Sequence, residues 1–387
     1  MGVRKAVVTD RDLRFEGGIE SDGAVSATTR TSSRRSVAGI QYLRGFAALM
    51  VVIYHLSLQW TKIAPGAARY LTLQSGVDVF FVISGFVMAY STGAGAKLSA
   101  LEFMRHRIVR IAPLYWTDTL ATAVILLIYP TAANIVRLEP HLFLASLAFV
   151  PYFNVATRDY TPLVLVGWTL NFEMFFYVVF ALAIWLGQRQ PAKVMILSLS
   201  VLTLLPLAGM VGLRWYFATP MLLEFALGVL VAAGFEKCRK LPFAVAALLC
   251  CIGIIWLVVP PAGAPEDRVG RYALPALLLL VSAVQSSWPS IKWLHRLGDI
   301  SYSLYLSHFL LLAVFAVAWR RLGLGSGALA HLAFFTSGGA LALTCGYLCW
   351  RWLELPLTRS VRRHLSPSLR TEEIVTPHAR RSRNERE

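Results

Sequence analysis

The segment Gly39–Trp60, GIQYLRGFAALMVVIYHLSLQW, determines the fold class of this chain. Its apolar residues are numerous enough to cross a bilayer, whose hydrocarbon core is about 30 Å thick. It also carries Arg44 near its start and His55 in its interior, separated by about 16 Å of rise along a helix. An ionisable side chain at that depth costs free energy, so we expect His55 to serve a function. A neutral histidine that hydrogen-bonds between helices is the simpler alternative.

Composition places the whole chain among polytopic membrane proteins. Of its 387 residues, 57% are hydrophobic and only 15% are charged, and the mean hydropathy is +0.59. The formal net charge of +16 would suggest nucleic-acid binding in a soluble protein. Here most basic residues lie in short segments between apolar runs, so the positive-inside rule explains them without a nucleic acid. The five cysteines lie in or beside apolar runs, and we expect neither disulfides nor a metal site.

Ten apolar segments predict an all-α fold of about ten transmembrane helices. A shorter apolar run, residues 141–153, ends in a proline-containing stretch and is predicted to be interfacial or re-entrant. The distribution of Lys and Arg then favours cytoplasmic termini, because counting the short run as a span removes the charge bias. The predicted spans cover approximately residues 40–58, 75–91, 108–129, 163–186, 193–211, 216–235, 242–259, 272–287, 299–318 and 328–351.

The same pattern divides the chain into three regions. Residues 1–37 are polar and lack apolar periodicity, which predicts a disordered cytoplasmic tail. Residues 38–357 form the predicted membrane domain, and residues 358–387 form a basic cytoplasmic tail. Every candidate functional residue therefore lies in the middle region.

The predicted topology brings Asp78 to the depth of His55. The second span, SGVDVFFVISGFVMAY, runs opposite to the first, so both residues fall in the outer half of the membrane. A carboxylate beside an imidazole fixes its tautomer and stabilises its charged form, and such a pair can deprotonate a hydroxyl. Alternatively, Asp78 ends its helix in contact with water, and residue spacing does not decide between the two.

Arginines gather where the third span begins, in FMRHRIVRIAPLYW. Arg107 and Arg110 lie three residues apart and share one helix face. A guanidinium binds two phosphate oxygens at once, so arginines at a membrane face suit a polyphosphate. Topological anchors or contacts with anionic lipids would give the same pattern.

The fourth and ninth spans carry the remaining candidates. Glu173, in VGWTLNFEMFFYVVF, lies near mid-membrane and needs a partner, a proton or a wet cavity. Trp168 in the same segment either lines a site or belongs to the interfacial aromatic belt. Tyr305 and His308, in GDISYSLYLSHFLLL, share one helix stripe and either line a cavity or bond to neighbouring helices.

Taken in order, these segments resemble the acyltransferase-3 family of integral membrane O-acyltransferases. The resemblance covers residues 39–357, and its ordered set of motifs is more specific than any single one. The second motif is most similar to exopolysaccharide O-acetyltransferases of the succinoglycan type. The motifs are LRG followed by a His eleven residues after its Arg, then SGVDVFFVISGF, RHRIVRIAPLYW, WTLNFEMFFY and LGDISYSLYLSH.

The resemblance implies transfer of an acetyl or other short acyl group from cytoplasmic acyl-CoA, usually acetyl-CoA, to a hydroxyl of a cell-envelope or exported saccharide. Arg44 and His55 match the family's Arg–His motif, and Arg107 and Arg110 match its RxxR motif. Glu173 falls where the family is commonly acidic. The implied setting is the bacterial inner membrane, with the bilayer and a saccharide or lipid-linked glycan as partners.

The leading hypothesis makes His55 the general base on the acceptor hydroxyl, oriented by Asp78, with a covalent acyl-histidine as the variant mechanism. A proton-coupled transporter, or a non-catalytic subunit of a polysaccharide export system, would also bury such residues. A transporter predicts internal repeats between the two halves, and none is visible in the sequence. We expect catalysis from His55, Asp78 and Glu173, CoA binding by Arg44, Arg107 and Arg110, and acceptor binding by Trp168, Tyr305 and His308.

Overall fold

The protein is an all-α membrane protein, as the sequence predicts. Six helices in the described part of the chain are long and apolar enough to cross a membrane, and three shorter apolar helices accompany them. The only β pairing in that part is an isolated bridge between Asn154 and Asp159. The computed structural model describes residues 24–92, 99–128, 137–186, 193–199, 216, 217, 219, 221–235, 240–259 and 269–365.

The observed helices agree with the predicted spans wherever the chain is described. Nine of the ten spans contain one of the helices given below. Of the remaining span, residues 193–211, only residues 193–199 are described, and they are helical. The number of spans and the location of the termini stay predictions. The helices are α1 (Ala24–Trp60), α2 (Gly76–Thr92), α3 (Ala100–Ile128), α5 (Trp168–Trp185), α7 (Met221–Phe235), α8 (Phe243–Val258), α9 (Leu274–Gln285), α10 (Lys292–Arg321) and α11 (Ala328–Cys349).

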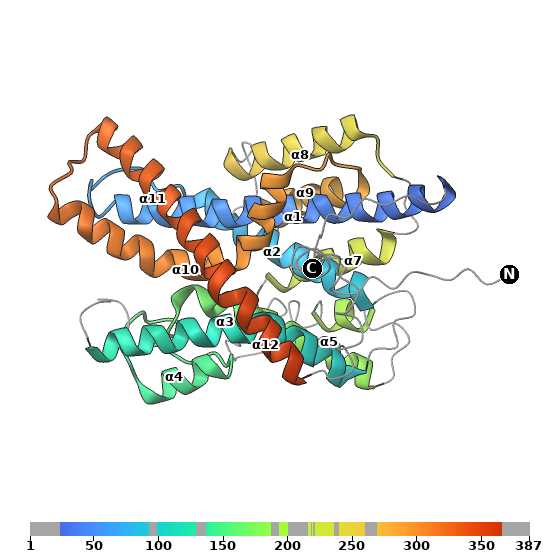
Figure 1. The fold of residues 1–387 in the computed structure, drawn as a ribbon, viewed down its shortest axis with the longest axis horizontal. Helices are drawn as coiled ribbons and strands as arrows, with labels where there is room; N and C mark the ends of the chain where they lie inside the picture. Colours follow the sequence, from blue (N-terminus) through green and yellow to red (C-terminus); the bar gives the residue numbers. More distant parts are fainter. Residues whose placement is uncertain are drawn as a thin grey trace, which may run out of the picture.

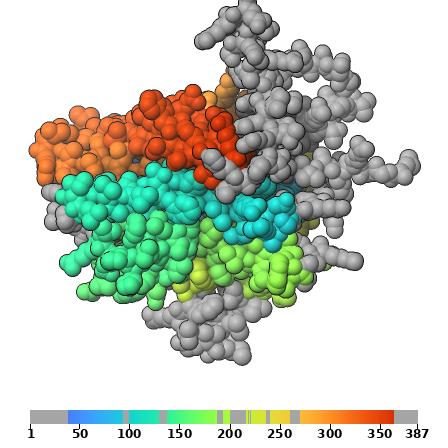
Figure 2. Space-filling view, turned by 60° about the horizontal axis from the view of Figure 1, so that its bottom comes forward, coloured from blue at the N-terminus to red at the C-terminus, as the bar shows by residue number. Residues whose placement is uncertain are grey.

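The predicted tails fall only partly on described residues. Residues 1–23 lie outside them, while residues 24–37 continue α1 toward the N-terminus. At the other end, a π-helical turn, η4 (Trp350–Glu354), leads into α12 (Leu355–Leu365). Figure 2 shows α12 lying against α3 on the surface of the bundle. The disordered state of the two tails therefore stays a prediction.

The short apolar run at residues 141–153 forms a helix that is too short to cross a membrane. It forms α4 (Pro140–Leu147), whose eight residues rise only about 12 Å. The Trp116 indole donates a hydrogen bond to the Leu147 carbonyl oxygen (2.8 Å), which fixes α4 against α3. The chain then returns to a 3-10 turn, η2 (Leu165–Gly167), that leads into α5. This path agrees with the predicted interfacial or re-entrant segment.

Helix α1 lies between α8 and α9 on one side and α2 and α10 on the other (Figure 1). It packs along α10, and α2, α9 and α11 contact its other sides. Because neighbouring helices pack around this part of α1, two of its ionisable residues, Arg44 and His55, line cavities inside the bundle.

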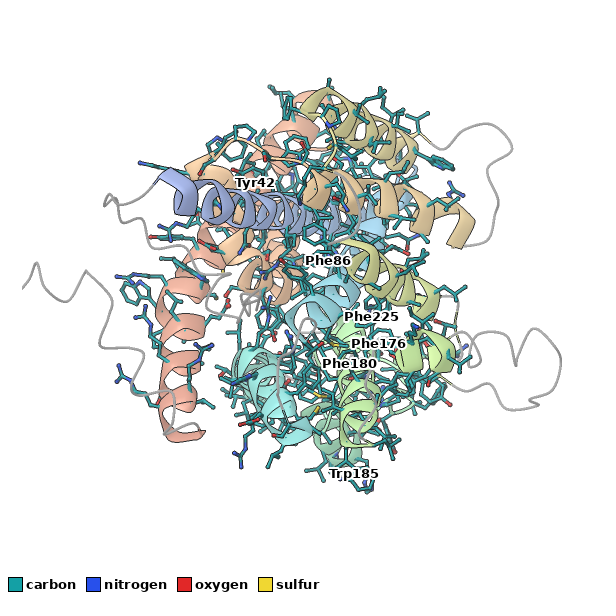
Figure 3. All side chains as sticks on the ribbon, turned by 90° about the vertical axis from the view of Figure 1, so that its right-hand side faces the viewer. Tyr42, Phe86, Phe176, Phe180, Trp185 and Phe225 are labelled. Carbon is teal, nitrogen blue, oxygen red and sulfur yellow. The ribbon has the colours of Figure 1, made fainter. Side chains whose placement is uncertain are left out.

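Helix α2 is held close to α7 by a pair of glycines. A Cβ atom on Gly228 would lie 2.0 Å from the Val82 carbonyl oxygen, and one on Gly85 would lie 2.1 Å from the Phe225 carbonyl oxygen. Only glycine allows the two backbones to approach so closely. Phe225 also stacks on Phe176 of α5, with ring centroids 3.7 Å apart (Figure 3). These contacts fix α2, whose other side lines the cavities that follow.

Candidate active site

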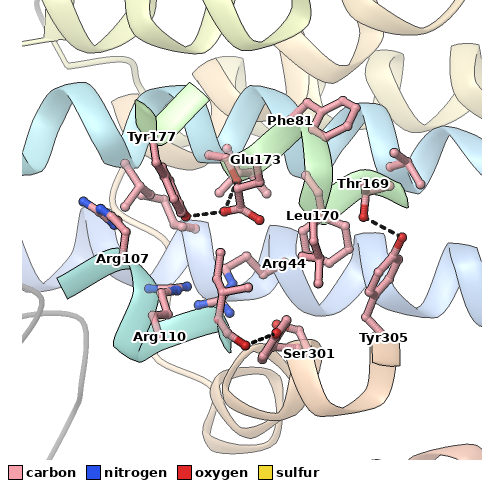
Figure 4. A pocket seen from close by; sticks show the side chains of 18 of the residues that line it. Arg44, Phe81, Arg107, Arg110, Thr169, Leu170, Glu173, Tyr177, Ser301 and Tyr305 are labelled. Atoms are coloured by element: carbon pink, nitrogen blue, oxygen red, sulfur yellow. Dashed lines mark hydrogen bonds between the residues drawn. The ribbon is translucent and has the colours of Figure 1, made fainter. Parts of the chain in front are cut away.

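Three arginines line a cavity between α1, α2, α3, α5 and α10. Arg44 comes from α1, and Arg107 and Arg110 come from one face of α3, as their spacing predicts (Figure 4). The structure therefore brings together the three residues predicted to bind CoA. We call this space the arginine cavity.

Glu173 lies in the arginine cavity and supplies the carboxylate beside the arginines. Its Oε1 accepts hydrogen bonds from the Tyr177 hydroxyl (2.5 Å) and the Ser84 hydroxyl (3.3 Å). Its charge attracts the Arg44 guanidinium, which Arg110 repels. With three arginines against one glutamate, the lining keeps a net positive charge that favours an anionic ligand.

Arg107 is held firmly in place. Its side chain is buried, and Nη2 donates a hydrogen bond to the Ser91 hydroxyl oxygen (2.6 Å). The guanidinium also lies 5.3 Å from the centre of the Phe103 ring and 5.7 Å from that of Tyr177. These contacts orient its planar donors before any ligand arrives, which lowers the entropic cost of binding.

A second and larger cavity has His55 in its lining. Val77 and Tyr305 line both cavities, so these two residues form the wall between them. The Tyr305 hydroxyl lies 2.9 Å from both the Thr169 hydroxyl and the Val166 carbonyl oxygen, which ties α10 to the start of α5. Figure 4 shows this contact at the end of the arginine cavity opposite the arginines. We call the second space the histidine cavity.

His55 is paired with His308 of α10. His55 Nδ1 lies 3.1 Å from His308 Nε2 and 2.9 Å from the Val51 carbonyl oxygen. His308 Nδ1 lies 3.0 Å from the Leu304 carbonyl oxygen. A carbonyl oxygen only accepts, so both Nδ1 atoms carry hydrogen and His308 Nε2 accepts from His55. In its neutral form, His55 therefore presents an unprotonated Nε2, the atom that a general base needs.

This arrangement differs from the predicted one, in which Asp78 orients His55. Asp78 is fully buried and lines neither cavity. Within the described residues, the polar contacts of His55 are to Val51 and His308. Residue spacing places two side chains at one depth, but it does not give the direction in which each points around its helix.

The predicted acceptor-binding residues divide into two groups. Trp168 and Tyr305 line the histidine cavity, whereas His308 is fully buried behind His55 and lines neither cavity. Glu173, predicted to act in catalysis, lies across the wall from His55, in the other cavity. His308 therefore contacts His55 rather than a substrate.

The histidine cavity also contains residues that the sequence interpretation did not identify. Its lining includes four polar or aromatic residues of one short segment and an aromatic side chain just before α7. The only signal in the sequence is a polar stretch, NVATRDYT, between two apolar runs. These residues are Thr157, Asp159, Tyr160, Thr161 and Tyr216.

Comparison with known proteins identifies the family of this chain. A family model described as an acyltransferase domain matches residues 37–351. The exopolysaccharide production protein ExoZ of Rhizobium meliloti (strain 1021) is 33% identical over 299 residues, which cover 74% of this chain and 90% of that protein. Acyltransferase MdmB of Streptomyces mycarofaciens is 27% identical over 362 residues, which cover 80% of this chain and 91% of that protein.

A third relative is longer than this chain. O-acetyltransferase OatA of Staphylococcus aureus (strain NCTC 8325 / PS 47) is 27% identical over 329 residues. The match covers 72% of this chain but only 51% of OatA. No solved structure matches the chain. The family match identifies the protein as an enzyme and so argues against the transporter and the non-catalytic export subunit. The chain belongs to the acyltransferase-3 family of membrane O-acyltransferases.

Proposed function

We propose that the protein transfers an acetyl or other short acyl group from acyl-CoA in the arginine cavity to a saccharide hydroxyl in the histidine cavity. One observation carries this proposal: two cavities of different chemistry share a wall at Val77 and Tyr305. Phosphates suit the first cavity, and a hydroxyl that must lose a proton suits the second. The acyl group then crosses only the short distance between them.

The arginine cavity is suited to the CoA end of the donor. Arg44, Arg107 and Arg110 present planar donors that bind phosphate oxygens in pairs. Apolar side chains such as Phe80 complete the lining and suit the uncharged pantetheine arm. About 16 Å of helix rise separates Arg44 from His55, and an extended pantetheine arm spans that separation. We assign Glu173 the role of holding Arg44 rather than moving the acceptor proton.

His55 acts as the general base in this mechanism. Its Nε2 takes the proton of the acceptor hydroxyl while the hydroxyl oxygen attacks the thioester carbonyl carbon. The new C–O ester bond forms, the C–S bond breaks, and the proton passes from His55 to the CoA thiolate. His308 Nε2 accepts a hydrogen bond from His55 Nδ1 throughout, which stabilises the imidazolium. A covalent acyl-histidine is the alternative, in which the same Nε2 attacks the thioester.

We place the enzyme in the bacterial inner membrane, with the arginine cavity toward the cytoplasm, where acyl-CoA is made. ExoZ is named for exopolysaccharide production and OatA for O-acetyl transfer, and both names support a saccharide acceptor and an acetyl donor. The positive-inside distribution of Lys and Arg supports the same orientation.

The test is to incubate membranes containing the protein with acetyl-CoA labelled in the acetyl group and to isolate the glycans. The glycans come from a strain that lacks the gene, so that the acceptor hydroxyl is free. We expect label in a glycan, in a linkage that mild base cleaves, as an ester requires. Absence of label from every glycan fraction, with the protein present and intact, would overturn the proposal.

A further inference from the structure

A short segment, Asn154–Thr161, contributes to the histidine cavity beyond the catalytic residues. It follows α4 and contributes Thr157, Asp159, Tyr160 and Thr161 to the cavity lining. Acyl transfer as proposed uses none of these four side chains, so their presence in the cavity requires a separate explanation.

The segment is a closed loop whose shape its own hydrogen bonds maintain. Asn154 is 2% exposed, and its backbone pairs with that of Asp159 through a donated bond of 2.9 Å. Its side-chain oxygen accepts from the Ala156 amide (3.0 Å), and the Thr157 and Thr161 hydroxyls lie 2.7 Å apart. A loop that is already ordered loses little conformational freedom when a ligand binds.

The loop presents a carboxylate and an aromatic ring side by side. Asp159 Oδ1 accepts a hydrogen bond from the Tyr160 amide (2.7 Å), which orients the carboxylate and leaves its second oxygen to accept from a ligand. The Tyr160 side chain is 41% exposed, and its ring centre lies 5.7 Å from that of Tyr216, another lining residue. Tyr216 in turn stacks on Phe172, with ring centres 4.8 Å apart.

The lining of the histidine cavity differs from that of the arginine cavity in charge. Among the described residues that line the histidine cavity there is no Lys or Arg, and Asp159 is the acidic one. Such a lining repels phosphates and carboxylates. An uncharged sugar ring suits such a lining. Its hydroxyl groups can donate hydrogen bonds to a carboxylate, and its C–H face can pack on an aromatic ring.

We propose that Asn154–Thr161 is an acceptor subsite that binds a neutral sugar unit of the glycan. The Asp159 carboxylate accepts hydrogen bonds from the sugar hydroxyls, and the Tyr160 ring packs against the sugar face. The subsite holds the glycan so that a neighbouring hydroxyl reaches His55 Nε2. This inference rests on the proposed function and adds the residues and the charge class that select the acceptor.

The experiment compares variants of the full-length protein in membranes, with acetyl-CoA and the deacetylated host glycan that the wild-type protein labels. For Asp159→Asn and Tyr160→Ala we expect the KM for the glycan to rise about tenfold, as for the loss of a charged hydrogen bond or a stacking contact. The KM for acetyl-CoA should not change. Tyr160→Phe keeps the ring and should behave like the wild type. Val155→Ala is the matched control, since Val155 is exposed on the same loop outside the cavity lining.

Each outcome has one meaning. A wild-type protein that labels no glycan contradicts the proposed function itself. A wild type that is active, with an unchanged glycan KM in both Asp159→Asn and Tyr160→Ala, overturns the subsite. If Tyr160→Phe and Val155→Ala raise the glycan KM as much as Tyr160→Ala does, the subsite is also overturned. Such a result would mean that any change to the loop structure impairs the enzyme. A glycan fragment made only of acidic sugars that competes as well as a neutral one would contradict the proposed charge selection.

Discussion

The two cavities have opposite chemistry although they share a wall. The arginine cavity contains three guanidinium groups and one carboxylate, whereas the histidine cavity contains His55, the Asp159 carboxylate and several aromatic rings. Val77 and Tyr305 contribute to both linings. We propose that this contrast reflects two different substrates, an anionic donor and an uncharged acceptor, that meet where an acyl group can pass. Changes in one cavity should therefore alter the handling of one substrate and leave the other substrate unaffected.

The largest effect should follow replacement of the base in the histidine cavity. His55→Ala and His55→Gln remove the imidazole and with it the basic nitrogen. We expect the rate of acyl transfer to fall by about 10²- to 10⁴-fold, the usual contribution of general-base catalysis. Binding of acetyl-CoA, measured by equilibrium dialysis of the purified protein, should be close to that of the wild type. Acylation near the wild-type rate by either variant would contradict the mechanism.

His308 should come next, because it acts through His55. In His308→Phe one of the two acceptors for His55 Nδ1 is lost while the Val51 carbonyl oxygen remains, and we expect kcat to fall about tenfold for a charge-assisted hydrogen bond. Both KM values should change little, since His308 lines neither cavity. His308→Gln offers a side-chain oxygen as acceptor and should recover part of the lost rate. Equal rates in the two variants would indicate that His308 only fills space.

In the arginine cavity, Arg44→Gln should weaken binding of the acyl donor and leave binding of the acceptor unchanged. Loss of one charged contact to phosphate should raise the KM for acetyl-CoA about tenfold and leave the glycan KM unchanged. Arg105→Gln is the matched control, since Arg105 is exposed and does not line the arginine cavity. A rise in the glycan KM instead would mean that the two cavities are assigned the wrong way round.

The smallest specific effect should come from the helix pair that supports both cavities. Gly228→Ala places a methyl group 2.0 Å from the Val82 carbonyl oxygen, so α2 must move away from α7 at a cost of about 1–3 kcal/mol. We expect a lower melting temperature in detergent and a modest, similar loss for both substrates. Gly339→Ala has no neighbouring atom within 4 Å and should leave the melting temperature unchanged. A selective loss for one substrate would contradict a shared support.

Sequence reasoning predicted the fold class and the grouping of the three arginines better than it predicted the polar partner of His55. Apolar run length predicts a helix wherever it occurs, and the three-residue spacing of Arg107 and Arg110 fixes their common face. His55 and His308 are 253 residues apart on different helices, and no spacing rule brings them together. The predicted partner, Asp78, was chosen by depth alone, although contact also depends on how each helix is rotated.

The loop Asn154–Thr161 illustrates a second limit of sequence reasoning. Its residues have no apolar periodicity, so the sequence gives no reason to place Asp159 and Tyr160 in a membrane cavity. Their location depends on a turn closed by Asn154 and on the short α4 that returns the chain toward α5. Such long-range placement appears only in three dimensions. Glu173 is a similar case, because its depth was predicted and its cavity was not.

We propose that the two substrates occupy separate cavities on opposite sides of one wall. The most direct measurement uses sealed inside-out vesicles that carry the protein and enclose the deacetylated glycan. Labelled acetyl-CoA, which does not cross a bilayer, is added outside, where the cytoplasmic face is exposed. We predict ester-linked label on the enclosed glycan, and none with His55→Ala. Label that appears only when glycan and acetyl-CoA are on the same side of the membrane would contradict the account.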